Sequence, residues 1–232
     1  MTPQFTVTCP LGTEEILSLE LRRLGIQRIT VGRGAVTAKD KLHSAYKACL
    51  WSRVASRVLW QIGSFEAVTA EEMYEGIKCL PWGEHINPNG TLWVDFNGKS
   101  KHIRNEQFGA QKAKDAIVDH LRDSTDSRPN IQKWEPDVRV HIRLHHGLVL
   151  VQIDLSGRPL HFRTPEKHVN DAPLKENLAA AMLYAADWPR RAREGHPFVD
   201  PMCGSGTIAL EAAGMAIGRA PGLSRQHWGF TH

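Results

Sequence analysis

The chain has 232 residues and a mass of 26.0 kDa, which corresponds to one or two complete domains. Its 41% of hydrophobic and 23% of charged residues and its mean hydropathy of −0.35 are typical of a globular protein, and they exclude a disordered chain and a fibrous repeat. The formal net charge is +4, and the excess is largest between residues 95 and 170, which is weak support for nucleic-acid binding.

The first 51 residues predict a small α+β unit. The expected elements, in chain order, are a strand at 4–9, a helix at 13–24, strands at 29–31 and 35–38, and a helix at 41–51. Thr13 is a plausible N-cap of the first helix, and Gly25 lies just past its end. This order is typical of helices packed on an antiparallel sheet.

The middle of the chain predicts a second α+β unit. We expect a strand at 54–62, helices at 70–79 and 106–122, a strand at 91–96, and strands at 138–144 and 148–155 on either side of a turn. His141, His145 and His146 lie on alternating strand positions and in the turn, where they do not converge on one point. No metal site is therefore expected there.

The four cysteines, Cys9, Cys49, Cys79 and Cys203, are far apart and form no Cys-x-x-Cys pair. This spacing disfavours a disulfide scaffold and a structural zinc site. No apolar run reaches the roughly 20 residues of a membrane helix, and the N-terminus carries no basic region followed by an apolar stretch. The expectation is a cytoplasmic protein without a membrane partner.

The last third of the chain predicts a different order of elements. A long helix is expected from Asp171 and Pro173 to about Trp188, followed by a polar connection at 189–196. A short strand at 197–200, a glycine-rich turn and an alanine-rich helix at 208–217 follow. Strand, glycine loop and helix are the opening unit of a parallel nucleotide-binding sheet.

The glycine loop, residues 200–207 (DPMCGSGT), is the most specific motif. Glycines after a strand let backbone N–H groups approach a ligand, and the helix N-terminus behind them favours a carboxylate or a phosphate. Gly204, Gly206 and Ala209 also fit a dinucleotide pattern, but no acidic residue follows Glu211 to hold a ribose. A nicotinamide-dependent oxidoreductase is therefore a weak alternative. The full motif resembles the S-adenosylmethionine loop of methyltransferases that modify exocyclic amino groups.

Further segments extend this resemblance over the whole chain. They are residues 50–57 (LWSRVASR), 103–110 (IRNEQFGA), 114–119 (KDAIVD), 128–130 (RPN), 153–157 (IDLSG), 172–179 (APLKENLA) and 219–223 (RAPGL). Together they resemble the THUMP-domain RNA methyltransferases, and among these the bacterial enzymes that methylate guanine N2 of 23S ribosomal RNA. The resemblance implies a ferredoxin-like part at 1–52, a THUMP RNA-binding domain at 53–164 and, from 165 to 232, the incomplete start of an α/β Rossmann-like methyltransferase domain.

The resemblance also implies the binding residues. The residues implied for S-adenosylmethionine are Asp200, Pro201, Cys203, Gly204, Ser205, Gly206 and Thr207 of the glycine loop, with Lys175, Glu176 and Asn177. The candidates for RNA contact are Lys99, Lys101, Arg104, Asn105, Lys112 and Lys114. An ordinary solvated charged surface explains each of them equally well, except that Arg104 and Asn105 are favoured because they lie within the resembling segment 103–110. Arg53 and Arg57 are expected to pair with carboxylates inside the domain. The seven tryptophans are expected in the core or at interfaces.

One departure from the family concerns catalysis. The Asn/Asp-Pro-Pro-Tyr motif that would hold the target base is absent from the 232 residues, so no catalytic residue is assigned and the chain is expected to be inactive alone. Two alternatives stay open. The chain could be a non-catalytic THUMP RNA-binding module, or it could belong to a guanine-N2 methyltransferase that acts on tRNA.

Overall fold

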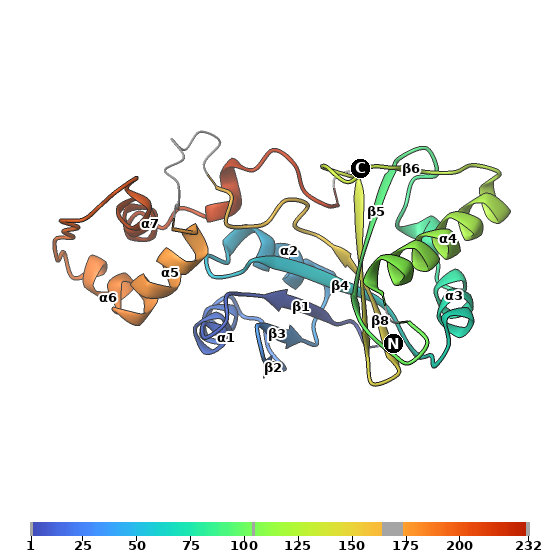
Figure 1. Ribbon diagram of the computed structural model, residues 1–232. Coiled ribbons are helices and arrows are strands. Elements are labelled where there is room, and N and C mark those ends of the chain that lie inside the picture. Colours follow the sequence, from blue (N-terminus) through green and yellow to red (C-terminus); the bar gives the residue numbers. More distant parts are fainter. Residues whose placement is uncertain (1, 104, 164–173, 231–232) are drawn as a thin grey trace. The chain divides into compact units, whose positions relative to one another are not determined.

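The computed structural model describes residues 2–103, 105–163 and 174–230 (Figure 1). The chain forms two compact units. The first unit combines residues 1–58 with residues 158–226, and the second unit contains residues 59–157 with residues 227–232. The beginning and the last third of the sequence therefore fold together, although about a hundred residues separate them.

The first unit begins with a three-stranded antiparallel sheet in the order β2-β3-β1. Its elements are β1 (Phe5–Thr8), α1 (Glu14–Arg23), β2 (Ile29–Gly32), β3 (Ala35–Ala38) and α2 (Leu42–Trp51). Phe5, Val7 and Val36 are fully buried, as are Leu17 and Leu21 of α1. The alternation of buried residues on the strands and their spacing on the helix give the unit its core. Thr13 is the N-cap residue of α1, but its hydroxyl donates to the carbonyl of Pro10 rather than capping the helix.

In its described residues, the rest of the first unit contains three helices and a short 3₁₀ turn. They are α5 (Glu176–Ala185), α6 (Trp188–Arg193), α7 (Thr207–Ala216) and Pro221–Ser224. Leu183, Trp188 and Ala212 form a core shared by the three helices, and the Trp188 indole donates to the Ala212 carbonyl at 2.9 Å. This core fixes α7, and therefore the glycine loop that precedes it.

The second unit is a five-stranded mixed sheet in the order β4-β8-β7-β5-β6. Its elements are β4 (Arg57–Glu66), α3 (Ala70–Lys78), the 3₁₀ turn Trp82–Glu84, β5 (Thr91–Gly98), α4 (Glu106–Thr125), β6 (Asn130–Ile131), β7 (Val138–His145) and β8 (Leu148–Asp154). Strands β4, β8 and β7 are antiparallel neighbours, whereas β5 runs parallel to β7 and β6. Leu92 and Val140 are buried on the sheet, with Ile117 and Leu121 on α4, and these residues make the core.

The predicted α+β class with a Rossmann-like start is confirmed, but three local predictions are wrong. The helix expected to run to Trp188 ends at Ala185, because Asp187 takes a left-handed conformation with φ of 55°. The connection expected at 189–196 is largely the helix α6. Residues 197–200 form no strand, since no neighbouring strand pairs with them in the described part of the chain. The expected start of the long helix at Asp171 and Pro173 lies outside the described residues.

The tryptophans differ in exposure. Trp82 is fully buried and Trp188 nearly so, as expected of core tryptophans, whereas Trp51 is 40% and Trp134 79% exposed. Lys114, expected on the exposed side of α4, keeps only 19% of its side chain accessible. Within the described ranges, no helix is long and apolar enough to cross a membrane.

Candidate cofactor loop and its support

The glycine loop joins the end of the extended segment at Asp200 to the first turn of α7. Gly204 and Gly206 have φ angles of 52° and 75°, a backbone region that favours glycine. The Gly206 N–H donates to the Cys203 carbonyl at 2.8 Å, which closes the turn. An added Cβ at either glycine would meet no atom within 4 Å, so open space lies beside both. The glycines therefore serve the backbone conformation and leave room for a ligand.

The two carboxylate oxygens of Asp200 differ: one is hydrogen-bonded and the other is not. Its Oδ1 accepts from the Met202 N–H at 3.1 Å, which holds the side chain against the loop. Its Oδ2 is buried and has no hydrogen-bond partner among the described residues. A buried acceptor without a donor is costly unless a ligand supplies the donor. The loop thus fits a ligand with an amino or hydroxyl group near Asp200.

The other loop residues surround the helix N-terminus. Pro201 and Cys203 are exposed, and the Cys203 thiol is free. Thr207 is buried, with the hydroxyls of Ser205 and Thr207 3.2 Å apart. The first-turn N–H groups of α7 lack helical acceptors, and together with the helix dipole they favour a carboxylate or a phosphate. The structure thus brings the predicted residues 200–207 together as one loop.

The three predicted residues at the start of α5 differ in their exposure. Lys175 is exposed at the N-cap, whereas Glu176 and Asn177 are buried in the first turn of α5. The Asn177 amide nitrogen donates to the Ser56 hydroxyl at 2.9 Å, which ties α5 to the segment after α2. Its Oδ1 is buried without a partner in the described structure and is a second acceptor open to a ligand or a water molecule.

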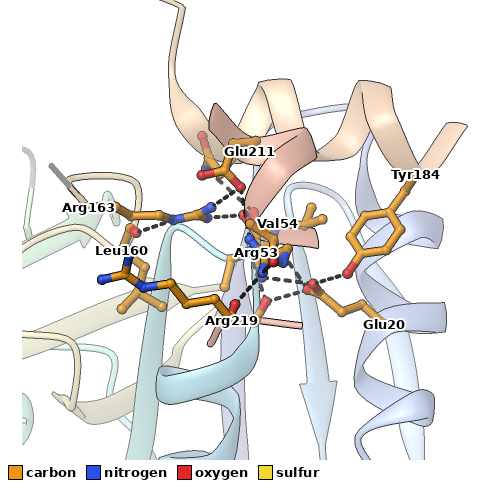
Figure 2. Close-up of polar contacts among 12 residues, drawn as sticks. Glu20, Arg53, Val54, Leu160, Arg163, Tyr184, Glu211 and Arg219 are labelled. Atoms are coloured by element: carbon orange, nitrogen blue, oxygen red, sulfur yellow. Dashed lines mark hydrogen bonds and ion pairs between the residues drawn. The ribbon is translucent and has the colours of Figure 1, made fainter. Parts of the chain in front are cut away.

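Arg53 is the residue that holds α7 in place (Figure 2). Its guanidinium lies 3.3 Å from the Glu211 carboxylate, donates to the Gly214 carbonyl at 3.0 Å and makes a short hydrogen bond to the Arg219 carbonyl. Arg163 bonds the same Glu211 oxygen at 2.6 Å and also donates to the carbonyl of Arg53. All three charged side chains are below 10% exposed. The expectation that Arg53 pairs with a carboxylate is confirmed, but the expectation that this carboxylate lies in the same domain is wrong, since Glu211 belongs to the predicted segment 165–232.

Glu20 organises the same region from α1 (Figure 2). Its carboxylate accepts from the Ser52 hydroxyl at 2.5 Å, from the Arg53 N–H at 2.8 Å and from the Val54 N–H at 3.3 Å. The Tyr184 hydroxyl of α5 adds a fourth donor at 3.0 Å. Burial raises the pKa of Glu20 above its usual range, and these donors offset only part of that effect. Glu20 therefore fixes the backbone that carries Arg53.

The predicted RNA-contact residues all belong to the second unit, but they differ in their environment. Lys99, Lys101 and Asn105 are exposed, and the Asn105 side chain caps α4 by accepting from the Gln107 N–H at 2.8 Å. Lys112 pairs with Glu71 at 3.6 Å, and Lys114 pairs with Asp115 at 2.7 Å. Arg104 lies outside the described residues. The two α4 lysines therefore offer less free positive charge than the sequence suggested.

The histidines of the second unit do not form a cluster of ligands. His141 lies between two carboxylates, with its Nε2 3.7 Å from Asp95 and 3.5 Å from Asp154. Within the described ranges, no three His, Cys, Asp or Glu side chains are placed to hold a metal ion.

Replacing Arg53 tests its support of α7. Arg53→Met should lower the free energy of unfolding by about 3–5 kcal/mol, because it removes one partner of a buried ion pair and leaves two carbonyls without a donor. Urea unfolding measures this loss. Arg190→Met is the control, since Arg190 makes exposed ion pairs with Asp187 and Glu194 that contribute little. Equal unfolding midpoints for the two variants would contradict the assignment.

The raised pKa of Glu20 predicts a pH dependence. The folded carboxyl keeps its proton to a higher pH than the unfolded one, so its contribution is fully present below the usual pKa of 4.5 and is lost as the pH rises through the folded pKa. The unfolding free energy of the wild type should therefore fall relative to that of Glu20→Gln as the pH rises from about 4 to about 8. Glu15→Gln, on the exposed side of α1, controls for the lost charge. A difference between wild type and Glu20→Gln that stays constant over this range would contradict the prediction.

Three protein families match successive parts of the chain. Residues 4–59 match the RlmL ferredoxin-like domain, residues 67–154 match the THUMP domain, and residues 163–232 match the RMKL-like methyltransferase domain. The glycine loop, Arg163 and Glu211 thus lie in the methyltransferase segment, and Glu20 and Arg53 lie in the ferredoxin-like segment.

Two known proteins illustrate the similarity. The ribosomal RNA large subunit methyltransferase K/L of Ectopseudomonas mendocina is 48% identical over 229 residues, which are 99% of this chain and 32% of that protein. The corresponding protein of Cellvibrio japonicus is 47% identical over 230 residues and 31% of its length. The chain thus spans about a third of the length of the curated relatives that it matches.

A solved structure with a similar fold is that of a protein from Listeria monocytogenes described as a predicted N6-adenine-specific DNA methylase. It is 30% identical, with a TM-score of 0.84 over 98% of this chain and 58% of that one. The structure of SMU.472 in complex with SAH is 31% identical, with a TM-score of 0.83 over 98% of this chain and 59% of that one. Over nearly its whole length, the chain is therefore similar in sequence to part of the K/L methyltransferases and in fold to these two solved structures.

Proposed function

We propose that the protein takes part in the S-adenosylmethionine-dependent methylation of ribosomal RNA. The observation that carries this proposal is the glycine loop, whose open glycines and spare Asp200 oxygen stand at the N-terminus of α7. The match of residues 163–232 to a methyltransferase domain and the SAH complex of SMU.472 support this cofactor. The bound cofactor supplies an electrophilic methyl group on a sulfonium.

The chain's own residues would bind and orient the cofactor. The first-turn N–H groups of α7 suit its carboxylate, and Asp200 suits its amino group. Arg53 and Arg163 hold Glu211, and therefore α7, so the N–H groups keep a fixed direction. Such pre-organisation matters because methyl transfer depends mainly on placing the nucleophile in line with the methyl group.

The proposed substrate is a guanine in 23S ribosomal RNA, methylated at the exocyclic N2. The ribosomal RNA methyltransferases at 48% and 47% identity support ribosomal RNA, and the THUMP match at 67–154 supports RNA binding by the second unit. The base must leave its stack to react, which favours a loop or an unpaired segment of RNA. This substrate also makes the cytoplasm the proposed location.

We further propose that the 232 residues alone bind RNA without transferring a methyl group, because they lack an Asn/Asp-Pro-Pro-Tyr motif. The proposed limits of the three segments are residues 1–52, 53–164 and 165–232, which limited proteolysis can test.

Two other substrates should be included in a test of the proposed function. One is tRNA, and the other is the adenine amino group, which the description of the Listeria structure suggests.

The direct test is methyl transfer from tritiated S-adenosylmethionine to 23S ribosomal RNA transcribed in vitro. The protein as it occurs in its own cells should label the RNA, and nucleoside analysis should find N2-methylguanosine. The 232-residue chain should bind the same RNA and leave it unlabelled. Labelled adenine, or labelled tRNA with unlabelled 23S RNA, would contradict the proposed substrate.

A second test concerns the cofactor contact of Asp200. Asp200→Asn should weaken the binding of SAH to the natural protein by about 10-fold to about 100-fold, since a hydrogen bond to a charged group contributes roughly 1.5–3 kcal/mol. Isothermal titration calorimetry measures the change. Asp187→Asn removes an exposed carboxylate that pairs with Arg190 and is the matched control. Equal affinities for the two variants would contradict the role of Asp200.

A further inference from the structure

One edge of the second unit's sheet is only partly covered. The short strand β6 pairs with Thr91 and Leu92 of β5, and the Gln132 N–H donates to the Leu92 carbonyl at 3.1 Å. In a parallel ladder the N–H and C=O of one residue point to the same neighbour, and alternate residues point to opposite sides. The backbone groups of Val94 and Phe96 therefore face the same edge as those of Leu92, beyond the reach of β6. Among the described residues, no hydrogen-bond partner faces them there.

A groove of about 350 Å³ runs along this open edge. Besides Val94 and Phe96 of the strand, the β5-edge groove is lined by Trp93, Asp95, Ile131 and, from α4, Glu106, Gln107, Ala110, Gln111 and Lys114. It thus combines an indole ring, two side-chain amides, the carboxylates of Asp95 and Glu106, and the edge-facing backbone groups of Val94 and Phe96. These groups suit a flat ligand with hydrogen-bonding groups on its rim.

An unpaired cation contacts the groove, and an exposed tryptophan follows it in the sequence. The Lys133 Nζ is 5.8 Å from the centroid of the Trp93 ring, and no carboxylate in the described structure forms an ion pair with it. Trp134, the next residue, has 79% of its surface exposed. Its aromatic surface is therefore available to a ligand.

The backbone that carries Lys133 and Trp134 is nevertheless fixed. The Gln132 amide donates to the carbonyls of Trp134 at 2.7 Å and Glu135 at 3.1 Å. Arg139 donates to the Lys133 carbonyl at 2.7 Å while its other nitrogen pairs with Asp95 at 2.7 Å. The ring of Trp134 is therefore presented to solvent by an ordered loop, which lowers the entropy cost of binding.

We propose that the β5-edge groove and Trp134 form a binding site for single-stranded RNA. One unstacked base lies on the Trp134 ring, a neighbouring base enters the groove, and Lys133 faces the phosphate backbone. Aromatic stacking combined with a cation is the usual means of binding unpaired RNA. This inference rests on the proposed function, since it places part of the RNA contact. Apart from Lys114 at the groove, it assigns that contact to residues that the sequence did not single out.

The experiment measures the binding of the 232-residue chain to a fluorescein-labelled oligouridine of about 12 nucleotides by fluorescence anisotropy. Trp134→Ala should weaken binding by about 5-fold to about 100-fold, because stacking contributes roughly 1–3 kcal/mol per base. Trp134→Phe should keep most of the affinity, since a ring remains. Trp51→Ala, which removes another exposed tryptophan, is the matched control and should bind like the wild type.

Salt dependence separates stacking from charge. Trp134→Ala should leave the slope of log K against log salt unchanged, whereas Lys133→Gln should reduce that slope by about 0.7. A Trp134→Ala variant that binds RNA like the wild type would overturn the inference and leave RNA binding by the THUMP domain intact. The open edge would then be available to a peptide strand. A wild type without affinity for the oligonucleotide, in a chain that also fails to bind 23S RNA, would overturn the inference and the proposed function together.

Discussion

The buried pairing of Arg53 and Arg163 with Glu211 is the constraint on which the architecture of the first unit depends. A charge that is taken out of water must be paired and hydrogen-bonded, so these three side chains admit few other arrangements. Arg53 and Glu211 are 158 positions apart in the sequence. This contact ties α7 and the segment after it to the ferredoxin-like part of the chain. The two carbonyls that Arg53 also bonds strengthen the connection. Glu20 supports this arrangement by holding the backbone of Arg53.

The glycine loop, in contrast to these buried and fully bonded side chains, is open. Its conformation depends on two glycines with positive φ, and the space beside them is open. A rigid helix with a permissive loop at its N-terminus places backbone donors precisely while leaving room for the ligand that they bind. The second unit repeats this division. Its sheet and helices form an ordered core, and the groups with spare binding capacity, the β5 edge and Trp134, lie at its margin.

Local features were predictable from the sequence, and long-range contacts were not. Alternating apolar residues revealed β5 and β7, and the motif DPMCGSGT revealed the glycine loop. The break after α5 was missed because Asp187 adopts a left-handed conformation that no local pattern indicates. A carboxylate partner for Arg53 was expected, but only the fold identifies it as Glu211. The exposure of Trp134 and the low exposure of the Lys114 side chain likewise depend on the neighbours that the fold supplies.

The most direct measurement of the central claim is amide hydrogen exchange in the natural protein, with and without SAH. If the glycine loop holds the cofactor against the N-terminus of α7, SAH should slow exchange at Gly204, Gly206 and the first-turn amides of α7. The same experiment should leave the amides of β5 and α4 unchanged, because they belong to the second unit. Unchanged exchange in residues 203–210 at saturating SAH would contradict the account.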